Sequence, residues 1–174
     1  MKSKFVLLNI TVLLGLIVRA ENLIVNPNFT QIKDEKTATA WSNVGVFNIT
    51  FSAKDGSQPD MGYAVLAPGS KNTQGSIRQN MKNRVQPGKK YRLSFDCRGE
   101  NFKASDYGFL LINTSWKGNV GLRRFQLRQD GKWRKMSKVI VVPDNWTSVT
   151  AVIFAVNMQG KLYASNLQCE PIDD

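Results

Sequence analysis

The chain has 174 residues, with 24 Lys and Arg against 13 Asp and Glu, and it contains no histidine. The lack of histidine excludes Ser-His-Asp and Cys-His catalysis, imidazole zinc sites and a histidine pH switch. The formal charge of +11 and the pI near 9.9 would suit nucleic acid as a partner. Which class of partner this positive charge suits therefore depends on the compartment in which the protein works.

The first twenty residues have the pattern of a secretory signal peptide. Lys2 and Lys4 precede an apolar run over 5–18, and Val18-Arg19-Ala20 offers small residues at the two positions that a signal peptidase reads. The run is too short and too polar for a membrane span. We therefore expect residues 1–20 to be removed and the protein to be secreted, whether extracellular, periplasmic or at the cell surface. An uncleaved anchor or a buried core helix is the alternative.

Export changes the meaning of the basic charge. Loss of Lys2, Lys4 and Arg19 lowers the net charge from +11 to +8, and most of the excess then lies over 78–138. Outside the cytoplasm we expect no nucleic acid partner and no transmembrane segment. An acidic polysaccharide, anionic lipid headgroups or an acidic cell wall would fit the charge, and simple solubility is the alternative.

The rest of the chain consists of short apolar runs separated by Gly, Pro, Asn and Asp. Turn residues such as Pro87-Gly88 and Asp130-Gly131 mark the breaks. Only residues 31–37 could hold a helical turn. In 147–158 both the odd and the even positions are apolar, as in a central strand whose two faces are both covered. Many short strands predict an all-β fold, a β-sandwich. The predicted strands are 76–81, 91–98, 108–113, 122–127, 136–142, 147–158 and 161–169.

Both cysteines fall on the apolar side of a predicted strand. Alternation places Cys97 on the same face as Tyr91, Leu93 and Phe95, and Cys169 shares a face with Leu167. We therefore expect both cysteines to be buried. In an oxidising compartment Cys97 and Cys169 are candidates for a disulfide if their strands are neighbours, and two buried free thiols are the alternative.

Three segments of the chain resemble the family 4/9 carbohydrate-binding modules. The first is Asn22-Leu23-Ile24-Val25-Asn26-Pro27-Asn28-Phe29, followed by Trp41. The second, 76–95, carries a Pro-Gly turn and Tyr91-Arg92-Leu93-Ser94-Phe95, and the third, 131–167, begins with Gly131-Lys132-Trp133-Arg134. The resemblance covers residues 22–169. It implies that residues 21–174 form a single carbohydrate-binding domain, a jelly-roll β-sandwich of the galactose-binding-domain-like type.

The resemblance also bears on cofactors. Family members often hold a structural calcium ion with an acid after the opening Phe and an Asp in the last strand. Those positions are Thr30 and Ser165 here. Because calcium prefers several oxygen ligands, carboxylates above all, we expect no calcium, no other metal and no cofactor.

Sugar recognition by a β-sandwich needs flat aromatic faces and planar polar groups. Trp116 lies in the polar loop 113–121 and Tyr107 in the loop 104–108, so these two rings are candidate platforms. Trp41 and Trp133 match framework positions of the family, which implies core packing. The polar candidates for an outward-facing ligand surface are Arg78, Asn80, Arg124 and Gln126, with Arg92 and Asp96 on similar positions. A solvated outer face is the alternative for each of them.

The acidic residues do not form a recognisable catalytic pair. Glycoside hydrolysis needs two carboxyl groups across one cleft, whereas Asp96, Glu100, Asp106 and Asp130 are scattered among turns and strands. We predict a secreted, non-catalytic module that binds a poly- or oligosaccharide, anionic ones included, and not an enzyme. One alternative is an adhesion or assembly sandwich that binds a separate protein partner without a sugar site. A small polysaccharide lyase or hydrolase is less favoured.

Overall fold

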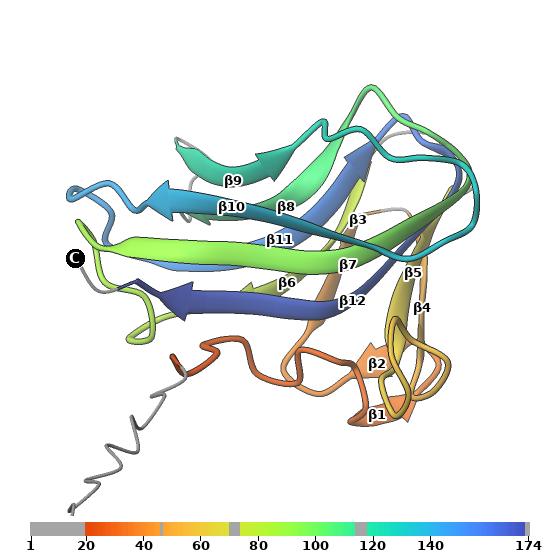
Figure 1. Ribbon diagram of the computed structural model, residues 1–174, viewed down its shortest axis with the longest axis horizontal. Coiled ribbons are helices and arrows are strands. Elements are labelled where there is room, and N and C mark those ends of the chain that lie inside the picture. Colours follow the sequence, from red (N-terminus) through yellow and green to blue (C-terminus); the bar gives the residue numbers. More distant parts are fainter. Residues whose placement is uncertain (1–19, 46, 70–73, 114–117, 173–174) are drawn as a thin grey trace, which may run out of the picture.

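The computed structural model describes residues 20–45, 47–69, 74–113 and 118–172 (Figure 1). Residues 1–19 of the predicted signal peptide and the candidate Trp116 lie outside these ranges. The described residues form strands and loops, and no helix among them is long and apolar enough to cross a membrane. The strands are β1 (Ile32–Asp34), β2 (Thr37–Ala38), β3 (Ser42–Gly45), β4 (Asn48–Ser52), β5 (Tyr63–Ala67), β6 (Gln74–Asn80), β7 (Lys90–Lys103), β8 (Asp106–Asn113), β9 (Asn119–Arg123), β10 (Arg134–Val141), β11 (Val149–Val156) and β12 (Gln159–Pro171).

Two five-stranded antiparallel sheets stack on each other, which confirms the predicted all-β sandwich (Figure 1). The β7 sheet has the order β10-β7-β12-β5-β4, and the β11 sheet has the order β3-β6-β11-β8-β9. The edge strands β9 and β10 belong to different sheets and contact each other, so the sandwich is nearly closed along that side.

The core lies between the sheets and is formed by every second side chain of their strands. Leu93, Phe95 and Cys97 of β7 are fully buried, and the Phe95 ring meets Phe109 of β8 with ring centroids 5.5 Å apart. The predicted two-sided burial of β11 is confirmed. Its inner residues join this core, and its outer residues Val152 and Phe154 form a second apolar cluster with Leu110 and Ile112 of β8.

The N-terminal third differs from the sequence prediction. Strands β1 to β5 were not predicted, and the helical turn expected over 31–37 is wrong, because β1 and β2 pair there as a small hairpin. These strands have two to five residues, which is too short for a clear alternation of apolar side chains. Tertiary contacts hold them instead, as where the buried Phe29 ring packs 5.3 Å from Trp41 and 5.5 Å from Phe51.

The predicted disulfide is not formed, and both cysteines are buried free thiols. Their strands β7 and β12 are indeed neighbours, but Cys169 pairs with Leu93 and Cys97 pairs with Ala164. The two cysteines are therefore offset by four residues along β7, about 13 Å, whereas a disulfide needs Cα atoms within about 7 Å.

We expect both thiols to be inert in the native protein. Burial raises the pKa of Cys97 and of Cys169 to about 12, so the reactive thiolate is scarce at pH 8. A thiol reagent such as DTNB should label neither cysteine in native protein and both in urea without a reductant. If the denatured, unreduced protein shows no free thiol, the two cysteines are linked in a disulfide and this strand register is wrong.

Candidate functional site

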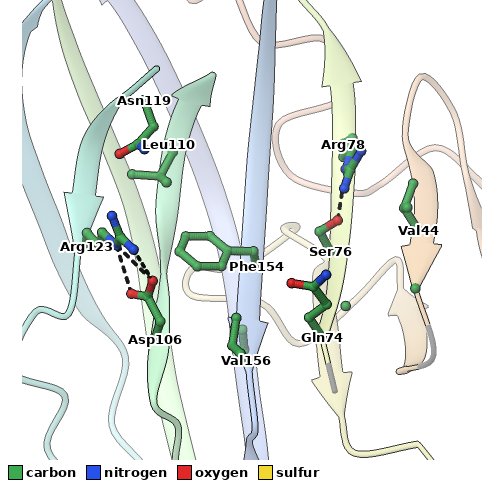
Figure 2. A pocket seen from close by; sticks show the side chains of 13 residues that line it. Val44, Gln74, Ser76, Arg78, Asp106, Leu110, Asn119, Arg123, Phe154 and Val156 are labelled. Atoms are coloured by element: carbon green, nitrogen blue, oxygen red, sulfur yellow. Dashed lines mark hydrogen bonds and ion pairs between the residues drawn. The ribbon is translucent and has the colours of Figure 1, made fainter. Parts of the chain in front are cut away.

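The outer face of the β11 sheet contains a groove of about 370 Å³ to which all five strands contribute (Figure 2). Its floor is apolar, with Phe154 and Val156 of β11 between Leu110 of β8 and Val44 of β3. Polar side chains lie on both sides of this floor; they are Gln74, Ser76, Arg78, Asp106, Asn119 and Arg123. An apolar floor with a few polar groups at its sides is typical of a small-molecule or glycan site.

The strand register brings these side chains together. Ser76 of β6 pairs with Phe154 of β11 on one side and with Val44 of β3 on the other, so the three lie in a row across the sheet. Because side chains alternate along a strand, Gln74 and Arg78 share the outer face with Ser76. The groove is thus a direct product of three neighbouring strands in register, with β8 and β9 adding the opposite wall.

That opposite wall is built around one partly dehydrated carboxylate. Nε of Arg123 donates to both oxygens of Asp106 at 2.9 Å, a second Arg123 nitrogen bonds the same carboxylate, and Nε of Arg124 lies 3.2 Å from it. The hydrogen bonds from Arg123, aided by the charges of both guanidinium groups, lower the pKa of Asp106 although its burial opposes this. Asp106 therefore stays ionised and fixes Arg123 as a planar group at the groove wall.

On the β6 side the groove carries a cation that is partly removed from water. Nε of Arg78 donates to Oγ of Ser76 at 2.9 Å, which holds the guanidinium along the strand (Figure 2). Burial lowers the pKa of Arg78 from its ordinary value, which means that the charged form has lost some of its hydration. Oxygen atoms of a ligand in the groove would take the place of the lost water molecules around Arg78, and anionic oxygens would bind it most strongly.

The polar residues predicted from the sequence are only partly brought together. Arg78 lines the groove, whereas Asn80 lies at the exposed end of the same strand and accepts a hydrogen bond from the Lys82 amide. Arg124 lies just beyond β9 and reaches the groove wall through Asp106, and Gln126 is exposed farther along the chain. The remaining two, Arg92 and Asp96, belong to β7 on the other sheet.

The aromatic candidates do not line this groove within the described ranges. Tyr107 lies on the inner face of β8, where its hydroxyl donates to the Phe125 carbonyl and its ring packs against Phe102 and Phe125. It therefore contributes to the core rather than offering a platform to a ligand. Trp116 is outside the described residues.

Sequence reasoning missed most of the groove, although one signal was present. Ser76, which already lay within the predicted strand 76–81, and Gln74, two residues before it, both share the parity of Arg78 and so could have been assigned to the same face. Arg123 was missed for a structural reason. The predicted strand 122–127 actually ends at Arg123, and Arg124 adopts a left-handed backbone with φ of 49°, which reverses the alternation beyond it.

The chain that carries this groove matches a known class of domain. Residues 21–165 match the carbohydrate binding domain family CBM_4_9. Because the match covers most of the chain, this protein belongs to that carbohydrate-binding family, as the resemblance predicted. No curated protein matches the sequence.

Similar solved structures share the fold at low sequence identity. The CBM22-1 xylan-binding domain of Paenibacillus barcinonensis Xyn10C matches with a TM-score of 0.64 and 9% identity, over 89% of this chain and 97% of that one. A cyclase from Fischerella sp. TAU matches with a TM-score of 0.65 and 10% identity, over 90% and 100%. The enzymatically active domain of bacteriophage CBA120 tailspike protein 4 matches with a TM-score of 0.62 and 12% identity, over 87% of this chain, which spans 21% of that one. The fold is thus a jelly-roll sandwich, and fold alone does not separate binding domains from enzymes.

Proposed function

We propose that this protein is a secreted, non-catalytic domain that binds a poly- or oligosaccharide in the groove of the β11 sheet. The observation that carries the proposal is the apolar floor around Phe154 with planar polar groups on both sides of it. The floor suits the C–H face of a sugar ring, and the guanidinium, amide and carboxylate groups suit its hydroxyls. Membership of the carbohydrate-binding family supports the same ligand class.

Polar contacts dominate this site more than ring stacking. Phe154 is the one aromatic side chain among the described residues that line the groove, and it is 7% exposed. The bonding capacity lies instead in Arg78, Arg123 and the amides of Gln74 and Asn119. We therefore propose that hydrogen bonds to hydroxyl or carboxylate oxygens, rather than aromatic platforms, provide the specificity.

The charge around the groove favours an acidic glycan. The described lining of the groove holds two cations, Arg78 and Arg123, and one acid, Asp106, and Arg124 lies beside the same carboxylate, so the charge on this side of the molecule is positive in sum. Guanidinium groups bind carboxylate and sulfate oxygens in a planar geometry, which neutral sugars cannot match. We propose a polymer with uronic acid or sulfate groups as the preferred ligand.

Two further observations support binding without catalysis and without calcium. The described lining of the groove holds one carboxylate, Asp106, and Arg123 keeps it ionised, whereas glycoside hydrolysis needs a second carboxyl group. Ser165, where the family often has an acid, is buried and donates its hydroxyl to the Gly62 carbonyl at 2.7 Å. A neutral hydroxyl bonded to the backbone in this way is a poor substitute for a calcium-binding carboxylate.

Isothermal titration calorimetry with hexagalacturonate and with xylohexaose tests the proposal. We expect the acidic hexamer to bind more tightly, with Kd between about 1 μM and 1 mM. Replacing Arg78 by Ala should weaken its binding about tenfold, because a charge-assisted hydrogen bond is lost. Arg92→Ala removes the same charge from the exposed side of β7 on the other sheet and should change Kd less than about twofold.

Three outcomes would argue against the proposal. Equal losses in Arg78→Ala and Arg92→Ala would assign the affinity to net charge and not to the groove. Binding to proteins with every glycan silent would favour the adhesion alternative. Release of unsaturated uronic products from the acidic polymer would make the protein a lyase.

A further inference from the structure

The outer face of the β7 sheet, on the opposite side of the sandwich from the groove, carries a cluster of aromatic rings. Tyr163 of β12 and Trp133, which directly precedes β10, hold the guanidinium of Arg98 of β7 against their rings, and Tyr63 of β5 packs against both rings. We call these four residues the aromatic cluster. Trp133 was expected in the core, and this expectation is wrong, because Trp133 packs on the outer face and stays partly exposed.

Strand register explains why these side chains meet. Tyr163 pairs directly with Arg98, and Arg134 pairs with Cys97, so Trp133 follows in line with Arg98. Tyr163 also pairs with Val65, which places Tyr63 on the adjacent diagonal position of β5. Three neighbouring strands and the residue that precedes β10 thus bring one side chain each to the same part of the sheet surface.

The cluster is held by ring contacts and not by ion pairs. The ring centroid of Tyr63 lies 6.3 Å from that of Trp133 and 5.7 Å from that of Tyr163. The guanidinium carbon of Arg98 lies 4.1 Å from the centroid of Tyr163 and 5.2 Å from that of Trp133, which are cation–π distances. Among the described residues the side chain of Arg98 forms no ion pair or hydrogen bond, and its Nε is buried without a partner, so its two terminal nitrogens keep their donor capacity.

A small recess of about 160 Å³ adjoins the cluster, and Arg98, Glu100, Asn101 and Tyr163 line it with Gln129. Glu100 accepts hydrogen bonds from the Tyr163 hydroxyl at 2.7 Å and from Nζ of Lys161 at 3.3 Å. These bonds lower the pKa of Glu100, so the carboxylate is ionised at neutral pH. The Gln129 amide bonds the Phe102 backbone N–H and C=O, which fixes the opposite wall.

We infer that the aromatic cluster and this recess form a second carbohydrate-binding site, suited to a single neutral pyranose unit. The partly exposed Tyr63 and Trp133 rings offer apolar faces to the C–H side of a sugar ring. The Glu100 carboxylate accepts hydroxyl hydrogens, and the Arg98 guanidinium donates to hydroxyl oxygens. The small volume of the recess limits the site to one unit, and the hydroxyls of a neutral unit can both donate to Glu100 and accept from Arg98.

The second site is independent of the groove on the other sheet. Because the two sites face opposite sides of the sandwich, one chain can contact two glycan strands. The inference adds to the proposed function and does not need the groove to bind the same sugar.

NMR of ¹⁵N-labelled protein titrated with the methyl β-glycosides of xylose, glucose and galactose tests the inference. We expect at least one of them to shift the amide signals of Gly99, Asn101 and Tyr163 at concentrations of about 1–50 mM. Trp133→Leu should abolish these shifts, and Glu100→Gln should weaken binding about tenfold. The matched control Glu170→Gln, on β12 of the same sheet, should leave the affinity within about twofold.

The possible outcomes separate the two sites. Shifts confined to groove amides such as Ser76 and Asn119 would overturn the second site and leave the groove in place. Shifts at Gly99 and Tyr163 that vanish in Trp133→Leu support it, even if the groove stays silent. No shift at the recess with any of the three glycosides would make the cluster a structural cap only. Glu100 is exposed, so Glu100→Gln remains informative if Trp133→Leu fails to fold.

Discussion

Phe95→Ala should lower the free energy of unfolding by about 3–5 kcal/mol, the largest stability effect that we expect from a single substitution. The Phe95 side chain is fully buried on β7, and its ring makes edge-on contacts with Phe109 at 5.5 Å and Phe125 at 5.4 Å. Phe109 belongs to the opposite sheet, so the truncation opens a cavity where the two sheets meet. Since domains of this size have a total stability of about 5–15 kcal/mol, much of the fold's margin would be lost.

Urea denaturation followed by tryptophan fluorescence measures this effect. Val139→Ala is a suitable control, because Val139 lies on β10 and is 54% exposed, and its truncation should change stability by less than about 0.5 kcal/mol. A loss below about 1 kcal/mol in Phe95→Ala would mean that the sheets can close over the cavity. That result would contradict the tight packing between β7 and β8.

Ser76→Trp should reduce glycan binding in the groove at least about 100-fold while the fold is retained. Ser76 lies on β6 in the groove, between Val44 of β3 and Phe154 of β11. A tryptophan at this position occupies the space of the ligand and also removes the hydroxyl that holds Arg78. The side chain points away from the core, so the added indole lies in the groove between Val44 and Phe154. Because Ser76 is 3% exposed, urea denaturation of this variant must show that the fold is retained.

Ser137→Trp is the matched control for this experiment. Ser137 is exposed on the outer face of β10 in the other sheet, and the substitution adds the same indole to the protein surface. Calorimetry with hexagalacturonate should give unchanged affinity for Ser137→Trp and no measurable binding for Ser76→Trp. Unchanged binding in both variants would move the glycan site elsewhere on the protein.

Strands with a clean alternation could be predicted from the sequence. Tyr91, Leu93, Phe95 and Cys97 were assigned to one buried face, and all four are 0–3% exposed. The two-sided burial of β11 also followed from its apolar residues at both parities. In both cases the local pattern is sufficient, because the period of two directly decides which sheet face each side chain joins.

Positions that depend on pairing between distant strands could not be predicted in this way. Cys97 and Cys169 lie on neighbouring strands, and only the register, which pairs Cys169 with Leu93, keeps them apart. The sequence predicts Tyr107 as an exposed ring in a loop before an apolar strand. In the structure β8 begins at Asp106, so Tyr107 belongs to the strand and its ring packs against the core.

The sequence by itself therefore determined the fold class, the carbohydrate-binding family and the buried faces of the long strands. Those properties depend on local alternation and on the order of motifs along the chain. The tertiary structure alone decided which polar groups meet. Arg78 and Asp106 reach one groove, and Arg98, Trp133 and Tyr163 reach one cluster, because sheet order and register bring distant residues to the same surface.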